Sequence, residues 1–291
     1  MKTLNSKIEK KEKFEKVKER LKNYHAGIWF LMLFLIPLII FFYLSRYVGY
    51  GSFQIGTNVN YSNETQFFTV SWNYLLQIVF LGPIIGIIYY ILMKKLFSKI
   101  DINIRKNQSI VYAIDICVVV LIILNCIGHF SHLGFEIVNA IDSTAGEALN
   151  SEYNELFVYA WFMDEWLGHT LIHVTYFGYL IVAMCAELLL NEDKRMKIDE
   201  LVLIILFSLF YSVIDGYAAI EGECGFILLL LHLIATCVAI AFIAIKKVNP
   251  LKCPLLLTLL ISTIFVFLFN LDWVIRYGKN SIYPFYSGNL S

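Results

Sequence analysis

Residues 226–245 read FILLLLHLIATCVAIAFIAI, a run without an acidic residue, a lysine or an arginine. A helix needs about 20 mainly apolar residues to cross the hydrocarbon core of a bilayer. Similar runs occur at 28–44, 77–93 and 199–214. The quoted stretch therefore predicts a transmembrane helix, and its recurrence predicts an integral membrane protein.

The composition agrees with this class of protein. Of the 291 residues, 59% are hydrophobic and 16% are charged, whereas soluble domains have roughly 45–50% apolar and about 25% charged residues. The 23 basic and 23 acidic residues cancel, which removes the overall electrostatic attraction on which nucleic-acid binding depends. We expect membrane lipids as neighbours and no nucleic acid as a partner. The composition does not indicate whether the protein is a monomer or an oligomer.

The apolar runs predict an all-α bundle of about seven membrane-spanning helices in one domain. The predicted spans lie at about 26–45, 74–95, 109–129, 166–190, 199–219, 224–246 and 253–275. Residues 1–25 would then form a charged tail, 26–276 the seven-helix domain and 277–291 a second tail. Residues 46–73 are polar and aromatic, and we expect a loop there.

The distribution of lysine and arginine predicts an orientation. The N-terminal tail carries nine of them, and the connectors after the second, fourth and sixth predicted spans carry most of the others. The segment between the third and fourth spans has none. The positive-inside rule then places the N-terminus and tail 1–25 in the cytoplasm, and the C-terminus with tail 277–291 outside. We expect a multi-pass protein of the cell membrane.

The third predicted span carries a polar stripe. In LNCIGHFSHLGFE, residues 124–136, the side chains of Asn125, His129, His132 and Glu136 recur at intervals of 4, 3 and 4. With 3.6 residues per turn, they lie along one face of a helix. Ionisable side chains inside a membrane are costly without partners. We therefore expect this face to be turned toward the interior of the bundle.

The fourth predicted span carries a second stripe. In MDEWLGHTLIHVTY, residues 163–176, the side chains of Glu165, His169, His173 and Tyr176 recur at intervals of 4, 4 and 3. Two histidines four residues apart, with a glutamate one turn earlier, have the spacing of metal ligands on a helix.

Further polar residues occur on the fifth and sixth spans. Ser208, Tyr211 and Asp215 follow one another at intervals of 3 and 4, and Glu221 and His232 lie near the start of the sixth span. In the predicted topology Asp215, His232 and both histidine stripes fall in the outer half of the membrane. We therefore expect four helices to build one site near the outer face.

Imidazoles with one or two carboxylates are the ligand set of zinc, non-haem iron and copper sites. We expect a divalent metal, zinc first, with iron or copper as alternatives. The predicted ligands are His129, His169, His173, His232 and Asp215. The predicted catalytic carboxylates are Glu165 and Asp215. The residues expected to support the ligands or to act as a base are His132, Glu136, Tyr211 and Glu221.

This site predicts a membrane-embedded metal-dependent enzyme, in the first place a hydrolase acting on a lipid or lipid-linked substrate. A bound metal lowers the pKa of its water toward 7, and Glu165 or Asp215 would accept the proton. We expect His25, which follows the charged tail, to lie at the surface.

Three other classes remain open. A redox protein would use the same histidines for iron, copper or a haem held by two imidazoles. An ion or proton transporter would use the cluster around Asp215 as a relay, and it would need a polar path through the inner half as well. In the sequence, that half shows little besides Asp115 and Ser208. The fourth class is a structural or receptor subunit with an outward polar pocket.

Seven spans that contain His and Asp resemble, in architecture and chemistry, the membrane hydrolases that include alkaline ceramidases and adiponectin-type receptors. The resemblance implies zinc held between helices. Those families have a His-x-x-x-His pair in the last span, whereas His169 and His173 lie in the fourth and the seventh has no histidine. No ligand position is therefore carried over from them.

Overall fold

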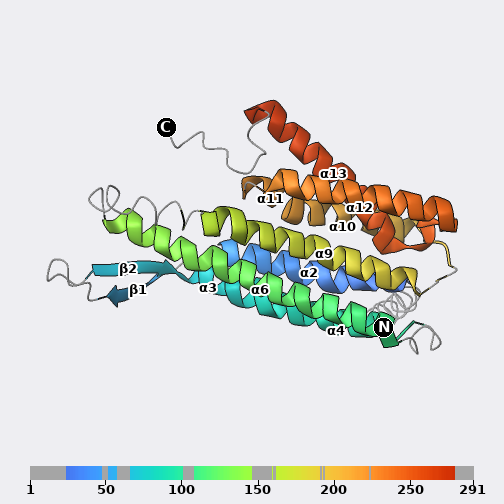
Figure 1. The fold of residues 1–291 in the computed structure, drawn as a ribbon, viewed down its shortest axis with the longest axis horizontal. Helices are drawn as coiled ribbons and strands as arrows, with labels where there is room; N and C mark the ends of the chain where they lie inside the picture. The colour runs from blue at the N-terminus through green and yellow to red at the C-terminus, as the bar shows by residue number, and fades with distance from the viewer. Residues whose placement is uncertain are drawn as a thin grey trace, which may run out of the picture.

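The structure is a computed structural model, and it describes residues 24–47, 52–57, 66–100, 108–145, 159, 162–190, 192, 194–222 and 224–278. Long helices run side by side, and a two-stranded sheet extends from one end of the bundle (Figure 1). The elements in chain order are α2 (Ala26–Tyr47), β1 (Ser52–Thr57), β2 (Gln66–Ser71), α3 (Trp72–Val79), η1 (Phe80–Ile84), α4 (Ile85–Phe97), α6 (Gln108–Ala145), η2 (Phe162–Gly168), α9 (His169–Leu188), α10 (Ile198–Ser212), η3 (Val213–Tyr217), α11 (Ala218–Glu221), α12 (Gly225–Lys246), η4 (Pro250–Lys252) and α13 (Pro254–Tyr277).

Six helical runs in the described part of the chain are long and apolar enough to cross a membrane. They are Leu76–Phe97, Ser109–Gly134, Phe162–Leu188, Ile198–Ile220, Gly225–Lys246 and Pro254–Tyr277. Helix α2 has 22 residues, and its apolar part Ala26–Phe42 is a shorter candidate. The predicted all-α membrane bundle is confirmed. The seventh crossing and the orientation in the membrane stay predictions.

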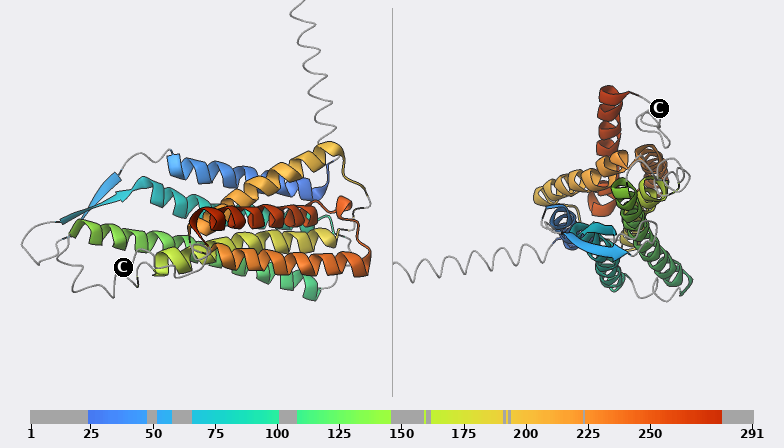
Figure 2. Two further views of the ribbon diagram at one scale, coloured as in Figure 1. Left: turned by 90° about the horizontal axis from the view of Figure 1, so that it is seen from above. Right: turned by 90° about the vertical axis from the view of Figure 1, so that its left-hand side faces the viewer.

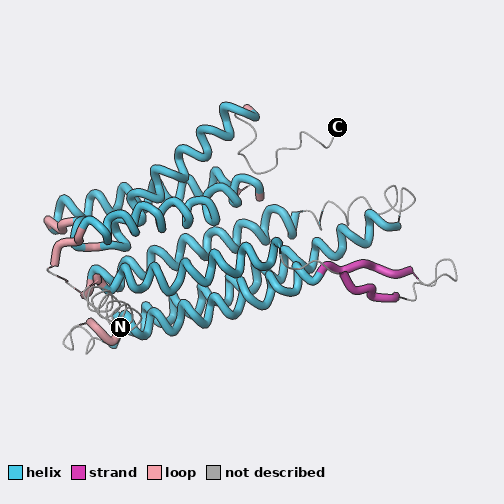
Figure 3. Tube along the Cα trace, turned by 180° about the vertical axis from the view of Figure 1, so that it is seen from behind, coloured by secondary structure: helices cyan, strands magenta, loops and turns pink. Residues whose placement is uncertain are grey.

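The two ends of the bundle differ in charge. Helices α4, α9 and α12 all end on the side opposite the sheet (Figure 1). Lysines and an arginine of residues 94–99, 194–197 and 246–252 gather there. We call this side the basic end and the other the hairpin end. Figure 3 shows from behind that the two strands lie at one end of the bundle only. Figure 2 shows the bundle from above and along its axis, with the C-terminal half of α13 tilted away from the other helices.

Residues 46–73 contain a β-hairpin where the sequence predicted a loop. Strand β1 pairs antiparallel with β2, with Ser52 opposite Ser71 and Thr57 opposite Gln66. The aromatic and β-branched residues of QFFTVS favour a strand. A two-stranded hairpin has little stability of its own, and β2 continues directly into α3 at Trp72.

An aromatic cluster holds α2, α4 and α9 together. The ring centroids of Tyr89 and Tyr179 are 4.0 Å apart, and Phe34 packs edge-on against both at 5.6 and 5.8 Å. The hydroxyl of Tyr89 donates a hydrogen bond to the backbone oxygen of Tyr179 at 3.0 Å. This bond satisfies a polar group that burial would otherwise make unfavourable.

His25 is buried, so the prediction that it lies at the surface was wrong. Its residue is 1% exposed. Its Nδ1 lies 2.8 Å from Oε1 of Glu200, and its Nε2 lies 2.7 Å from the backbone oxygen of Lys194. The start of α10 covers His25, which its charged sequence neighbours had suggested would lie in water. The pair joins the start of α2 to the start of α10.

Helices α6 and α9 approach closely because glycines lie between them. A Cβ on Gly168 would lie 2.9 Å from the backbone nitrogen of His132, and one on Gly128 would lie 2.9 Å from Cγ1 of Ile172. Small residues allow membrane helices to pack at short distance. This contact brings the histidine stripes of the two helices together.

Three π-helical segments interrupt the described helices: η1, η2 and η3. Such segments are rare and occur frequently at functional sites. Asp164 lies in η2 and Asp215 in η3, and these residues are 2% and 0% exposed. Two buried carboxylates therefore lie on π-helical turns of the backbone.

Candidate metal centre

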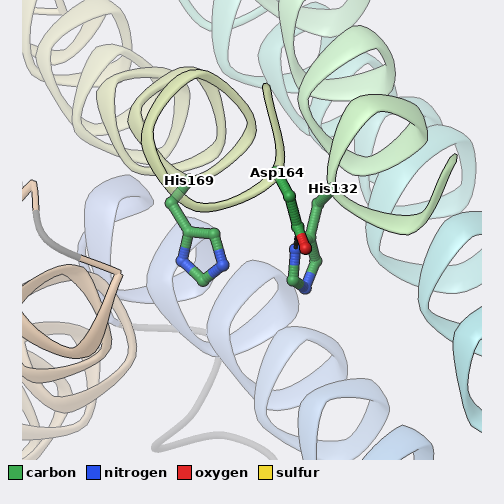
Figure 4. Close-up of side chains that lie close together, drawn as sticks. All are labelled: His132, Asp164 and His169. Carbon is green, nitrogen blue, oxygen red and sulfur yellow. Dashed lines mark hydrogen bonds and ion pairs between the residues drawn. The ribbon is translucent and has the colours of Figure 1, made fainter. Parts of the chain in front are cut away.

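Three side chains converge toward the hairpin end: His132 of α6, Asp164 of η2 and His169 at the start of α9 (Figure 4). Nδ1 of His132 lies 2.5 Å from Oδ1 of Asp164. The ring centroids of His132 and His169 are 4.4 Å apart, with the ring planes at 81°. One ligand atom from each residue lies within 4.8 Å of the other two. We call these residues the outer cluster.

The outer cluster combines a buried carboxylate with a partly open imidazole. The side chain of Asp164 is 2% exposed and that of His132 is 21% exposed. A buried carboxylate is costly without a partner, and His132 supplies one. Gly222 closes the cluster from another side, because a Cβ there would collide with Nδ1 of His169. The backbone at Gly222 therefore packs against His169, and the imidazole of His132 keeps part of its surface exposed.

The π-helical winding of η2 brings Asp164 to the outer cluster. Asp164 lies five residues before His169, which on a regular α-helix would separate the two side chains by about 140°. A π-helix instead bonds residues i and i+5 across successive turns. The sequence periodicity assumed an α-helix and therefore indicated Glu165. The side chain of Glu165 lies outside the described residues.

A second group, the deep cluster, surrounds Asp215. Oδ1 of Asp215 lies 3.2 Å from Nδ1 of His173, and Oδ2 accepts a hydrogen bond from the hydroxyl of Tyr211 at 2.7 Å. Nε2 of His232 lies 4.0 Å from Oδ2. All four residues are 5% exposed or less. The deep cluster brings together residues of α9, α10, η3 and α12.

Helix α13 adds the hydroxyl group of Thr263 to the deep cluster. Nδ1 of His232 lies 3.2 Å from Oγ1 of Thr263. Thr263 shares a 2.7 Å hydrogen bond with Thr236 and also donates to the backbone oxygen of Leu259 at 2.9 Å. His232 is therefore hydrogen-bonded on one side, to Thr263, while its Nε2 faces Asp215 at 4.0 Å without a hydrogen bond among the described residues.

The outer and deep clusters are neighbours along α9. The ring centroids of His169 and His173 are 6.2 Å apart. His169 belongs to the outer cluster and His173 to the deep cluster, so the four-residue spacing joins two groups of different composition. A polar column thus runs from the partly exposed His132 to the fully buried His232.

His129 stands apart from both clusters. Its Nε2 lies 3.2 Å from the hydroxyl of Tyr176, and the residue is 4% exposed. Asn125, one turn before it on α6, donates to the backbone oxygens of Leu81 and Gly82 at 2.8 and 3.0 Å. These bonds serve the carbonyls at the π-helical segment η1.

The structure thus divides the predicted ligand set. His169 meets His132, which was predicted only as a supporting residue, and Asp164, which was not predicted. His173, His232 and Tyr211 each face Asp215, at 3.2, 4.0 and 2.7 Å. The predicted residues whose side chains lie outside the described part of the chain are Glu136, Glu165 and Glu221.

Comparisons of the chain with models of protein families, with curated proteins and with solved structures find no match. The fold and the site therefore define the protein only as a helical membrane-type protein with a His/Asp/His group that could hold a metal ion.

Proposed function

We propose that this protein is a membrane-embedded, metal-dependent hydrolase and that the outer cluster holds its catalytic ion. The observation that carries the proposal is the convergence of donor atoms from His132, Asp164 and His169 within 4.8 Å. Two imidazoles and one carboxylate are a ligand set of catalytic zinc sites, which leave one position for water or substrate. Zinc is the first choice of metal.

The deep cluster provides a proton acceptor beside the outer cluster. The bound ion would supply an acidified water molecule. His173 lies one turn from His169, and its Nδ1 faces the carboxylate of Asp215. Asp215 would orient the His173 ring and stabilise its protonated form, so that the free nitrogen can take a proton. Tyr211 holds the other carboxylate oxygen in place.

The surroundings of His132 support a lipid or lipid-linked substrate. A shallow apolar groove of about 460 Å³ lies along the outer surface of α6, lined in part by Ile123, Ile127, Phe130 and Ser131. Ser131 precedes the partly exposed His132 in the chain. On this proposal an acyl chain lies in the groove and its polar end reaches around α6 to the outer cluster, since adjacent residues of a helix point about 100° apart. In the predicted topology this substrate belongs to the outer leaflet of the cell membrane.

Metal analysis of the purified protein tests the proposal. After dialysis against a weak chelator we expect about one ion per chain, because catalytic sites of this composition bind one. His169→Gln and Asp164→Asn should lose that ion. The matched controls His129→Gln and Asp272→Asn alter a histidine and an aspartate outside the outer cluster and should keep it. Equal metal content in all four variants would exclude the outer cluster as the site.

The redox alternative shares this ligand set, because two histidines and a carboxylate also bind non-haem iron. Elemental analysis and the visible spectrum of the same sample distinguish iron or copper from zinc. A haem held by both histidines of the outer cluster is not favoured. The rings of His132 and His169 touch at a centroid distance of 4.4 Å, which leaves no room for a macrocycle between them.

Proton transport is a second candidate function, supported by a polar seam between α10 and α13. The hydroxyls of Ser208 and Ser212 donate to the backbone oxygens of Thr258 and Ser262 at 3.4 and 3.2 Å. All four residues are fully buried. The seam extends polar groups from the deep cluster into the inner half, where the sequence alone indicated little.

Glu187 lies at the basic end of this seam. The residue is 5% exposed, and its Oε2 accepts a hydrogen bond from the backbone nitrogen of Leu255 at 2.8 Å. Its Oε1 has no hydrogen-bond partner among the described residues. A proton would therefore bind at Glu187, at the basic end of the seam.

Proton flux into liposomes that contain the purified protein separates the two candidates. On the transport hypothesis, Glu187→Gln stops a flux that the unaltered protein carries, and Glu192→Gln, a matched change nearby, leaves it in place. On the hydrolase proposal no flux is expected from either protein, and Glu187→Gln keeps its full metal content.

A further inference from the structure

A groove at the basic end separates the N-terminal half of α2 from the C-terminal end of α4. It has a volume of about 490 Å³, within the range of about 300–1,000 Å³ of small-molecule sites. Its lining includes Trp29, Phe30 and Leu33 on α2, and Leu92, Lys95 and Lys99 along and just after α4. It shares no residue with the outer or the deep cluster.

The groove is apolar along its length and basic at one edge. Phe30 is 4% exposed and forms part of the floor, whereas Leu33 is 40% exposed, so the groove is open along its side. Lys95, in the last turn of α4, and Lys99, two residues after the helix ends, both line the groove. Both lysines are exposed. An occupant must therefore have an apolar body and an anionic head.

These two lysines differ from their neighbour Lys94 in charge compensation. Nζ of Lys94 lies 2.8 Å from both carboxylate oxygens of Asp115. Within the described residues, no carboxylate forms an ion pair with Lys95 or Lys99. Two positive charges at the mouth of an apolar groove thus have no described acidic partner.

We propose that this groove binds an anionic phospholipid from the leaflet at the basic end of the bundle. Lys95 and Lys99 hold the phosphate, and an acyl chain lies along Leu92, Phe30 and Leu33. Basic pockets between transmembrane helices recognise anionic head groups in this way. In the predicted topology Trp29 lies at the inner end of the first span, where indole rings are enriched at the level of the head groups. In the predicted orientation this is the cytoplasmic leaflet.

Trp29 makes the proposal testable by fluorescence. The full chain is placed in phosphatidylcholine nanodiscs that contain a small fraction of phosphatidylglycerol with brominated acyl chains, which quench nearby indoles. We expect more quenching than with the same fraction of brominated phosphatidylcholine. The excess should disappear in Trp29→Phe, because the other four tryptophans lie outside the groove.

The lysines are tested with a matched pair of double variants. Lys95→Gln with Lys99→Gln should weaken the apparent affinity for phosphatidylglycerol roughly 30-fold, from the attraction of two lysines to anionic lipid. Lys246→Gln with Lys247→Gln removes the same charge at the same end but outside the groove, and should leave the affinity nearly unchanged. Added inorganic phosphate should not displace the lipid.

Three results would overturn the proposal. Equal loss of affinity in both double variants would show attraction to the whole basic end and not to the groove. Equal quenching by both brominated lipids would show an apolar groove without head-group recognition. Trp29 that neither lipid quenches would show that another occupant, such as residues 1–23 of this chain, fills the groove.

Discussion

Two histidine–carboxylate pairs lie at opposite ends of this bundle, and they have different surroundings. At the basic end, both ring nitrogens of His25 meet acceptors, the carboxylate of Glu200 and the backbone oxygen of Lys194. Glu200 also accepts hydrogen bonds from the backbone nitrogens of His25 and Lys197, each at 2.8 Å. At the hairpin end, the pair of His132 and Asp164 is joined by a third donor residue, His169.

The contrast between the two pairs shows that the surrounding groups, and not the pair itself, determine whether a histidine and a carboxylate have a structural or a binding role. Both side chains of the His25–Glu200 pair are 0% exposed, and their polar atoms form hydrogen bonds within the protein. The His132–Asp164 pair keeps 21% exposure on the imidazole and has further ligand atoms beside it. The first pair therefore holds the starts of α2 and α10 together, and the second has the donor atoms that a metal ion needs.

The largest expected effect concerns the pair at the basic end. His25→Ala leaves the carboxylate of Glu200 buried without its partner, and removal of one partner of a buried pair costs about 3–5 kcal/mol. We expect the free energy of unfolding in detergent to fall by that amount. Glu192→Gln, which removes a carboxylate 4.0 Å from His25 and 32% exposed, should cost about 1 kcal/mol or less. Similar losses in both variants would contradict a fastening role specific to Glu200.

The next effect concerns the pair at the hairpin end. Asp164→Asn should lower metal affinity roughly 100-fold or more, since even groups that only support metal ligands account for 10–100-fold. Added metal should then no longer raise the melting temperature, because binding to the folded state stabilises it. Tyr211→Phe, a change in the deep cluster, should leave metal affinity intact. An intact metal response in Asp164→Asn would mean that both pairs are structural.

A smaller effect concerns the helix contact that positions the outer cluster. Gly168→Ala forces a Cβ to within 2.9 Å of the backbone of His132, and overpacking of this kind costs about 1–3 kcal/mol. It should lower both the thermal stability and the metal affinity. Gly134→Ala on α6 meets nothing within 4 Å, so it should leave the metal affinity unchanged and raise the stability by about 1 kcal/mol or less, because alanine favours the helix. If Gly168→Ala behaves like Gly134→Ala, close packing does not position the ligands.

The smallest effect is expected for an exposed ion pair near the hairpin end. Nε of Arg276 lies 2.9–3.0 Å from the carboxylate of Asp272, one helical turn away, and the side chains are 64% and 50% exposed. Pairs of this kind contribute about 0.3–0.5 kcal/mol. Asp272→Asn should therefore change the free energy of unfolding by no more than that. A loss as large as that of His25→Ala would remove the distinction between buried and exposed pairs on which the comparison rests.

Most of the helical fold follows from the sequence. In lipid each spanning segment must satisfy its own backbone hydrogen bonds, so a local apolar run is enough to predict a helix, as at 226–245. The predicted third span illustrates the limit of this argument, because α6 continues to Ala145 beyond the apolar residues. The hairpin was missed because strand pairing joins residues 52–57 to 66–71, and hydropathy carries no information about that pairing.

The candidate site follows from the sequence only in part. Helical periodicity predicted that His132 and His169 lie on polar faces, and the structure places those faces together. It could not assign Asp164, because the π-helical winding of η2 shifts the face by one residue relative to an α-helix. It also could not separate His173 from His169, since the position of Asp215 relative to α9 depends on packing between distant segments.

The amino-acid sequence predicts which segments are helical and which of their faces are polar, because both properties depend on residues within a few turns of one another. Only the tertiary structure decided which polar groups meet. His25 meets Glu200 across 175 positions and His173 meets Asp215 across 42. Contacts over such distances depend on how closely the helices pack, and glycines at Gly128 and Gly168 govern that closeness for α6 and α9. The outer cluster exists because these two helices touch at His132.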